Sequence, residues 1–347
     1  MRYKLLGRSG LRVSELCLGT MTFGEEWGWG ADKKESRRMF DTFLEVGGNF
    51  IDTANRYTEG TSEKLVGEFM ADRRQEIVLA TKYTLYMKQG EPNSAGNHRK
   101  NMVQALENSL KRLKTDYIDL YWLHAWDYLT PVDEVMRAFD DMVRAGKVLY
   151  IGVSDTPAWI IAQANTLAEL RGWTPFVGLQ IEYSLLERTV ERELLPMARA
   201  FDMAVTPWGA IGGGVLTGKY SKARPTESTT KRYEEDNESP RLSEKSLAIA
   251  DEVVKVSEEA GCIPAQVAIN WVRQQPGLMI PIIGVRTEAQ LKENLACLDH
   301  PLTEDHLQRL NEVSRIELGF PHDFLTKDFI RNLVYAHSFD RIDNHRI

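Results

Sequence analysis

The feature that most constrains this chain is a regular alternation of short apolar runs with longer amphipathic segments. The apolar runs read as strands at 15–18, 49–52, 77–81, 117–124, 148–154, 177–182, 203–208 and 279–283. Helical patterns lie between them at 32–46, 61–70, 99–113, 131–145, 157–171, 191–201, 243–274 (split near Pro264) and 287–296. Eight strands alternating with eight helices predict an α/β fold, the (β/α)₈ or TIM barrel.

A doubly wound open sheet shows the same alternation and is the structural alternative. Both folds need near-continuous apolar strands, because parallel strands are covered on both faces. No G-x-G-x-x-G motif follows the first strand, and titratable residues end several different runs. The pattern therefore favours the barrel.

Composition places the chain among globular proteins, with one domain over residues 1–347. The formal net charge is −7, and no block of like charges indicates a nucleic-acid arm or a basic membrane face. Cys17, Cys262 and Cys297 form no CxxC pair and no zinc spacing. The N-terminus has no signal-peptide core, and no run approaches a membrane span. We expect a soluble, cytoplasmic protein without metal, nucleic-acid or membrane partners; homo-oligomerisation stays open.

Three segments lie outside the alternation. Residues 3–13 surround a Gly-Arg-Ser-Gly turn and predict an N-terminal β-hairpin. Residues 219–245 are charged and rich in Ser and Thr, which is typical of a mobile loop that covers a cofactor or of disorder. Residues 300–347 contain a helix near 304–316 and an aromatic tail, and we expect this extension to pack back on the barrel.

Four titratable residues follow three of the predicted strands. Asp52 ends one strand and is followed by Tyr57, Lys82 ends the next, and His124 ends a third. An ammonium beside a phenol lowers the phenol's pKa, and a carboxylate holds the ammonium in place. Tyr57 could then protonate a carbonyl oxygen, with Lys82 and Asp52 tuning it and His124 orienting the substrate. Taken singly, each residue is better explained as part of a structural ion pair, a loop aromatic or a buried histidine; together at the carboxyl ends of three strands, the four favour function.

Several longer motifs make a resemblance specific. They are NFIDTANRY, LATKY, YWLHAWD, Gly-Val-Ser at 152–154, LQIEYSLLER, PWGAIGGGVLTGKY and PIIGVRTEAQLKENL. In this order, over about residues 3–298, they resemble the aldo-keto reductase superfamily, in the branch of long microbial aldehyde reductases and potassium-channel β-subunits. The resemblance implies a barrel without a Rossmann domain that binds NADP(H), with Asp52, Tyr57, Lys82 and His124 as the catalytic tetrad.

The resemblance also implies a cofactor site. Ser154, Asp155 and Gln180 would contact the nicotinamide carboxamide, although Asp155 stands where relatives have asparagine and its carboxylate can only accept. Trp208 would stack on the nicotinamide, where many relatives have tyrosine; its alternative is core packing. The remaining cofactor positions are Gly19, Thr20, Met21, Asp52, Gly209, Ala210, Ile211, Leu216, Gly218, Lys219, Gly284, Arg286, Gln290, Glu293 and Asn294.

Two cofactor segments have a second interpretation. Gly213 to Lys219 nearly fits a Walker A loop, but Tyr220 stands where a Mg²⁺-ligating Ser or Thr belongs, so an NTPase is disfavoured. Thr287 to Gln290 fits a capping box, which is the structural alternative for Gln290. Arg286, at a predicted helix start, suits a ribose 2′-phosphate and favours NADP(H) over NAD(H).

Aromatic residues follow the first, third and fourth strands and could wall a substrate pocket for apolar or sugar-like aldehydes: Trp27, Trp29, Tyr83, Tyr86 and Trp126. The functional hypothesis is an NADP(H)-dependent reductase of aldehydes or ketones acting on a small-molecule carbonyl. The alternative is a slow-turnover NADP(H)-binding subunit that senses redox state for a protein partner. An intact tetrad is consistent with both.

Overall fold

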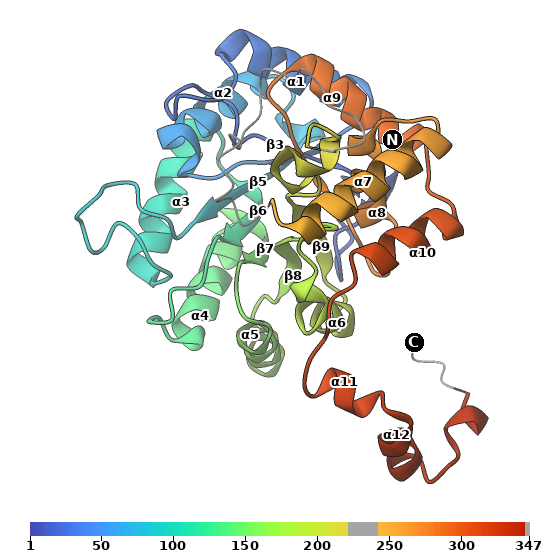
Figure 1. The fold of residues 1–347 in the computed structure, drawn as a ribbon. Helices are drawn as coiled ribbons and strands as arrows, with labels where there is room; N and C mark the ends of the chain where they lie inside the picture. Colours follow the sequence, from blue (N-terminus) through green and yellow to red (C-terminus); the bar gives the residue numbers. More distant parts are fainter. Residues whose placement is uncertain (221–241, 344–347) are drawn as a thin grey trace.

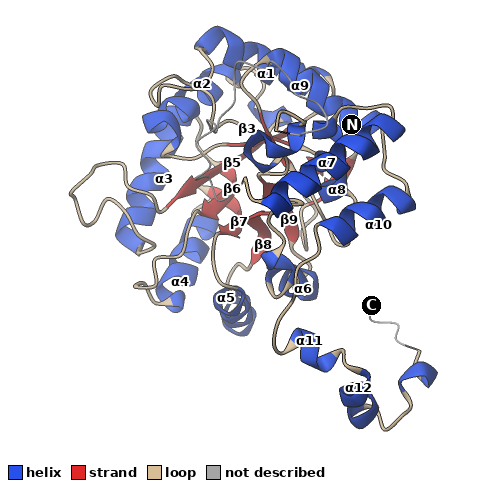
Figure 2. Ribbon diagram, in the orientation of Figure 1, coloured by secondary structure: helices blue, strands red, loops and turns tan. Residues whose placement is uncertain are grey.

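A computed structural model describes residues 1–220 and 242–343 of the chain. Eight parallel strands form the centre and helices surround them (Figures 1 and 2), which confirms the predicted barrel. In their order around the sheet the strands are β10 (Ile282–Gly284), β3 (Cys17–Gly19), β4 (Phe50–Asp52), β5 (Val78–Tyr83), β6 (Ile118–Leu123), β7 (Val148–Ser154), β8 (Phe176–Glu182) and β9 (Ala204–Trp208). A parallel bridge between Val205 and Met279 brings the two ends of the sheet together.

The helices match the predicted pattern, including the split before Pro264. They are α1 (Lys33–Glu45), α2 (Thr61–Phe69), α3 (Arg99–Leu113), α4 (Val132–Arg144), α5 (Ala158–Arg171), α6 (Leu194–Ala200), α7 (Glu244–Glu259), α8 (Pro264–Arg273), α9 (Glu288–Leu295) and α10 (Glu304–Val313). Asp32, Ser243, Thr287 and Thr303 cap four of them, each accepting from a backbone N–H three residues on. Each such cap stabilises its helix by about 1 kcal/mol.

Alternation along the strands divides the core into two clusters. Phe50, Val78, Ala80, Leu120 and Trp122 belong to a cluster inside the barrel, whereas their strand neighbours, such as Ile51, Leu79 and Tyr121, pack against the helices. Because residues two apart on a strand share a face, each inward row continues to the carboxyl end of its strand. Asp52, Lys82 and His124 stand at those ends, and the fold thereby collects them at one mouth.

The large Trp122 ring occupies the barrel interior because two neighbouring strands carry glycine beside it. A Cβ on Gly152 would lie 2.3 Å from the ring, and one on Gly178 would lie 2.9 Å from it. These contacts are too short for any side chain, so the glycines make room for the indole. Trp122 is fully buried and fills the barrel below the site.

The predicted N-terminal hairpin is present as β1 (Tyr3–Leu5) and β2 (Arg12–Ser14), which pair antiparallel. Leu6 and Val13 join the interior cluster. At Gly7, φ is +54° and a Cβ would lie 2.3 Å from the Val177 carbonyl oxygen, so only glycine fits. The hairpin therefore closes the barrel end at which the strands begin, opposite the tetrad.

The C-terminal extension differs from the expectation that it packs on the barrel. α10 packs against α7, but residues 318–343, which we name the C-terminal arm, lead away from the barrel (Figure 1). The arm contains α11 (His322–Leu325) and α12 (Asp328–Val334), and none of its residues is buried. The aromatic residues of the arm predicted that it would be buried, but the barrel of the same chain does not cover them.

The charged segment 219–245, predicted to cover a cofactor, lies mostly outside the described residues, as do 344–347. Within the described ranges, no helix combines the length and apolar character needed to cross a membrane.

Candidate active site

Lys82 is the centre of the candidate site. Its side chain is fully buried, and its ammonium Nζ donates three hydrogen bonds: to Asp52 Oδ2 at 2.5 Å, the Thr53 carbonyl oxygen at 2.8 Å and Tyr57 Oη at 2.9 Å. An ammonium has three N–H donors, and each now has an acceptor. Lys82 thus holds Asp52 and Tyr57 together and has no donor left for another group.

Burial would lower the pKa of Lys82, but the neighbouring Asp52 and Tyr57 outweigh burial and raise it above its ordinary value. The lysine is therefore charged at neutral pH. Asp52 also accepts at Oδ1 from the Gln180 side-chain amide, 3.1 Å away. Gln180 was predicted at the nicotinamide carboxamide; the structure shows that its NH₂ group contacts Asp52.

The Tyr57 hydroxyl accepts from Lys82, its one hydrogen-bond partner within the described residues. Its own proton is thus free for another acceptor. Desolvation raises the pKa of Tyr57, and Lys82 opposes this only in part. Lys82 lowers the pKa of Tyr57, as expected from the sequence, but burial is the larger effect, so the pKa lies above its ordinary value. Tyr57 stays protonated at neutral pH.

His124 lies beside Tyr57, with the two rings edge to face and their centroids 5.9 Å apart. Burial, with a smaller contribution from the charge of Lys82, lowers the pKa of His124 well below its ordinary value. The imidazole is therefore neutral at pH 7 and has one N–H donor. Its Nδ1 is buried and unpaired among the described residues.

The loop that carries Tyr57 is held in an unusual backbone conformation. Thr58 and Glu59 both have positive φ, +45° and +55°, which costs each roughly 1–2 kcal/mol. The Thr58 hydroxyl donates to the Phe23 carbonyl oxygen at 2.7 Å and accepts from the Ser62 N–H at 3.1 Å. These contacts fix the loop and, with it, the position of Tyr57.

A set of side chains beside Tyr57 forms what we name the rim: Trp27, Arg56, Glu59 and Tyr86. Glu59 pairs with Arg56 and accepts from the Trp27 indole N–H at 3.1 Å. The Arg56 guanidinium lies over the Tyr86 ring, 4.5 Å from its centroid. The rim joins loops after β3, β4 and β5, and its opposite charges balance.

The predicted substrate-pocket residues separate into two groups. Trp29 lies next to Trp27, with ring centroids 5.7 Å apart, and Trp126 is half-buried against the core. Tyr83 was predicted at the mouth, and this is wrong. It is fully buried among the helices, stacks on Tyr121 and donates to the Asn97 carbonyl oxygen at 3.1 Å. Lys82 points into the barrel, so its neighbour on β5 points outward.

The predicted nicotinamide residues lie at adjacent strand ends. Ser154 and Gln180, at β7 and β8, are opposite each other in the strand register, and Trp208 ends β9. Asp155 has positive φ, +39°, and its backbone contacts Trp126 and Gln180. Thr20, after β3, donates to the Asp52 carbonyl oxygen at 3.0 Å.

The predicted pyrophosphate and ribose residues form a second set. In η4 (Gly212–Thr217), Gly213 and Gly214 have positive φ, and a Cβ on Gly214 would meet no atom within 4 Å. The same holds for Gly284 at the end of β10, so the backbone at both glycines is open to a ligand. The other predicted positions divide by burial: Gly19, Ala210, Leu216, Gly218 and Asn294 are buried, Gly209, Ile211 and Lys219 are half-buried, and Met21, Arg286 and Glu293 are exposed.

At the start of α9 the predicted capping box forms only in part, because the Gln290 side chain accepts from Arg286, the residue before the N-cap, and not from Thr287. The Gln290 backbone N–H donates to Thr287 Oγ1 at 3.2 Å, and its Oε1 accepts from the Arg286 N–H at 3.0 Å. The side-chain NH₂ of Gln290 is the part left for a ligand.

A family comparison decides the class of the protein: the model of the aldo/keto reductase family matches residues 15–315. The chain belongs to the aldo/keto reductase family. It is 40% identical to norsolorinic acid reductase of Aspergillus flavus, over 92% of this chain and 83% of the relative. It is 38% identical to aryl-alcohol dehydrogenase [NADP(+)] of Phanerodontia chrysosporium, over 90% and 86%. A putative aryl-alcohol dehydrogenase of Saccharomyces cerevisiae is 36% identical, over 94% and 90%.

In this aldo/keto reductase, the rim includes two residues that sequence reasoning did not assign. Arg56 and Glu59 flank Tyr57 in the chain, but neither their ion pair nor the left-handed backbone of Glu59 has a sequence signal. Adjacency to the candidate acid is the one feature that could have marked them.

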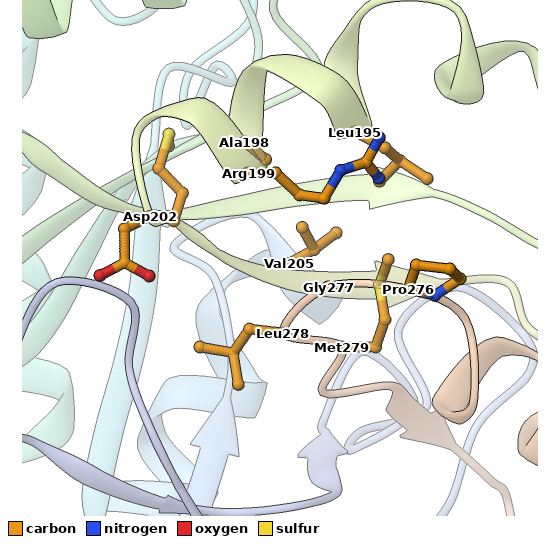
Figure 3. A pocket seen from close by; sticks show the side chains of 10 residues that line it. Leu195, Ala198, Arg199, Asp202, Val205, Pro276, Gly277, Leu278 and Met279 are labelled. Carbon is orange, nitrogen blue, oxygen red and sulfur yellow. The ribbon is translucent and has the colours of Figure 1, made fainter. Parts of the chain in front are cut away.

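A small cavity of about 140 Å³ lies elsewhere in this aldo/keto reductase (Figure 3). Arg199, Asp202, Val205 and Met279 are among the residues that line it, where α6 meets the beginning of β9. The candidate catalytic residues stand at strand carboxyl ends, so this cavity is at the opposite end of the barrel. Over the described part of the chain, no three His, Cys, Asp or Glu side chains cluster as a metal site.

Proposed function

We propose that this protein is an NADP(H)-dependent oxidoreductase that reduces aryl aldehydes or ketones to alcohols, with Tyr57 as general acid. The observation that carries the proposal is that every N–H donor of the Lys82 ammonium already has an acceptor. All three of its N–H groups are used on Asp52, Thr53 and Tyr57, so the phenol oxygen is an acceptor toward Lys82 and its proton remains available.

Tyr57 would act through a change in relative basicity. Its raised pKa keeps the phenol protonated in the resting protein. As a substrate carbonyl oxygen gains negative charge, that oxygen becomes the stronger base and takes the phenol proton. The phenolate that remains lies 2.9 Å from the Lys82 ammonium, which stabilises the new charge. Asp52, which accepts from Gln180, would hold Lys82 in place during this transfer.

Neutral His124 would orient the substrate. A neutral imidazole can donate one N–H to the same carbonyl oxygen, whereas an imidazolium would compete with Tyr57 as the proton source. The lowered pKa of His124 therefore supports a positioning role with a donor that keeps its proton.

The chain's own residues fit an extended nucleotide. Open backbone at Gly214 and Gly284 admits close approach of a pyrophosphate, and Arg286 stands exposed at the start of α9, where a 2′-phosphate would be favoured. Half-buried Trp208 offers a ring face for stacking. A bound nicotinamide supplies the hydride that the carbonyl carbon receives.

The substrate class follows from the rim and from the relatives. Trp27 and Tyr86 offer aromatic surfaces, and Arg56 already stacks on Tyr86. Flat aromatic rings prefer offset stacking or edge contacts with such side chains. The relatives' names specify norsolorinic acid and aryl alcohols. Aryl carbonyls are therefore proposed over aliphatic or sugar aldehydes.

The direct test is NADPH consumption with aryl, aliphatic and sugar aldehydes, with NADH in parallel. The proposal expects aryl substrates and NADPH to give the highest kcat/KM. Arg286→Ala should raise the Kd for NADPH at least tenfold and leave the weaker NADH binding unchanged. Lys292→Ala, which removes an exposed cation from the helix that follows Arg286, is the control. Equal effects of Arg286→Ala on both cofactors would contradict the 2′-phosphate role, and tight NADPH binding without turnover would contradict the reductase.

A further inference from the structure

The C-terminal arm (residues 318–343) is folded locally but has no core of its own. Phe320 and Phe324 contact each other with centroids 5.8 Å apart, and Tyr335 and Phe339 do so at 4.9 Å. Yet Phe320 is 84% exposed. A segment this short cannot bury enough apolar surface to stabilise itself. The arm therefore requires a surface outside itself.

The arm's exposed apolar area is large enough for a specific interface. The large exposed side chains are Phe320, Phe324, Leu325, Phe329, Leu333, Val334, Tyr335, Phe339 and Ile342. Together they present on the order of 900 Å². A standard protein interface buries about 800 Å² on each partner. The arm carries four acidic and three basic side chains, so its net charge is close to zero and does not oppose an apolar contact.

The arm's own barrel does not receive it. The arm's root is held by polar contacts alongside α6: the Arg192 guanidinium donates to the Glu317 carbonyl oxygen at 2.9 Å, and His322 lies 3.0 Å from Glu193. Beyond that point the arm extends away from the barrel (Figure 1).

A second surface with large exposed apolar side chains lies on α5, the helix next to α6. The outer face of α5 carries Trp159, Gln163, Thr166 and Leu170 at helical spacing, and the charged Glu169 is exposed beside them. Trp159 is 64% and Leu170 is 78% exposed. Helix α5 packs beside α6. The arm's root and the α5 face therefore lie on the same side of the protomer.

We propose that the arm of each copy docks on the outer face of α5 of a second copy, giving a dimer with two-fold symmetry. Such an interface is isologous, so each protomer must present both the arm and the surface that receives it. Here each surface carries large exposed apolar side chains, and both surfaces belong to one side of the protomer. A second copy of this chain therefore fits the arm better than an unrelated partner, because it brings a matching surface and a second arm.

Three exposed leucines permit a matched test on the full-length protein. Leu333 is on the arm, Leu170 is on the α5 face, and Leu129, 88% exposed in the loop before α4, is the control. Sedimentation velocity over a concentration series should show a wild-type dimer. Leu333→Glu and Leu170→Glu should each raise the dimer dissociation constant at least tenfold, since central apolar contacts dominate interfaces. Leu129→Glu should leave it unchanged. Because all three leucines are exposed in the protomer, circular dichroism should show that each variant is folded.

Exchange between copies is tested by mixing variants. Leu333→Lys and Leu170→Glu should each be monomeric alone, whereas their mixture regains one wild-type contact and one Lys–Glu pair and should dimerise. A wild-type monomer at all concentrations would overturn the proposal and indicate that the arm serves another partner. A dimer insensitive to Leu333 and Leu170, or a mixture that stays monomeric, would also overturn it.

Discussion

Two neighbouring residues on β5 donate hydrogen bonds at two different buried ion pairs. Lys82 points into the barrel and pairs with Asp52, whereas Thr81 points outward and donates to Glu63 at 2.6 Å. Glu63, on α2, is fully buried and pairs with Arg112 of α3 at 2.6 Å. Both pairs hold two elements together within the core of the protein.

The two ion pairs differ in whether a proton donor remains available once the pair has formed. Around Glu63, Thr81 and Arg112 donate to both carboxylate oxygens, and the set lies between the strands and the helices. Around Lys82, the third partner is Tyr57, whose proton has no acceptor within the described residues. A buried ion pair by itself thus indicates structure. One that orders a proton donor at a strand's carboxyl end indicates chemistry.

The largest expected effect is on turnover at the inner pair. Tyr57→Phe keeps the ring and removes the proton donor, so carbonyl reduction should fall by roughly 100- to 10,000-fold. NADPH binding, measured by quenching of protein fluorescence, should persist. Tyr121→Phe, which removes a buried phenol hydroxyl away from the mouth, should keep its turnover. Full activity of Tyr57→Phe would contradict the assignment of proton transfer to the Lys82–Asp52 pair and Tyr57.

At the outer pair the expected effect is on stability. Arg112→Met leaves Glu63 buried without its cation, and breaking such a pair costs about 3–5 kcal/mol of unfolding free energy. Urea denaturation measures this change. Arg37→Met breaks an exposed pair with Asp41 and should cost less than about 1 kcal/mol. Equal costs for the two substitutions would mean that burial does not distinguish them.

Thr81→Val sharpens the comparison because its side chain lies next to Lys82 in sequence and faces the opposite side. The substitution preserves shape and removes one donor to Glu63, so it should cost about 1–3 kcal/mol of unfolding free energy. Turnover per folded molecule should stay within twofold of wild type. A large loss of turnover would show that the two faces of β5 are coupled.

The smallest effect concerns pH. The pKa of His124 is lowered in the folded protein, so the unfolded chain binds more protons at acidic pH. The resulting stability is fully present above about pH 6.5 and is lost as pH falls toward the folded-state pKa, at up to about 1.4 kcal/mol per pH unit. Urea denaturation should therefore show wild type losing stability relative to His124→Gln as pH falls from 7.5 to 5. If the difference in unfolding free energy between wild type and His124→Gln did not change with pH, the assignment of a neutral His124 imidazole would be contradicted.

Much of the barrel could be predicted because the sequence patterns that specify its strands and helices are local. Apolar runs, helix caps and turn residues are read within a few positions, and β7 and α3 begin and end where the pattern places them. The tetrad positions follow from the same rule, since parallel strands bring their carboxyl ends to one mouth.

The features that the sequence did not predict correctly depend on the three-dimensional surroundings of the residues. Tyr83 was assigned to the mouth although the two-residue period of β5, with Lys82 inward, already directs it outward. The net pKa of Tyr57 depends on how completely the fold desolvates it, which adjacency to Lys82 does not reveal. The Glu63–Arg112 pair joins two helices, and nothing in either helix predicts it. The arm's aromatic residues predict a contact but not which surface provides it.

The most direct measurement compares turnover per folded molecule in Tyr57→Phe and Arg112→Met, in one assay of NADPH oxidation with an aryl aldehyde. The folded fraction of each variant is determined by circular dichroism at the assay temperature. We expect Arg112→Met to stay within about twofold of wild type and Tyr57→Phe to fall below about 1% of it. Similar losses in both variants, or substantial turnover by Tyr57→Phe, would contradict the assignment of chemistry to the inner pair and structure to the outer one.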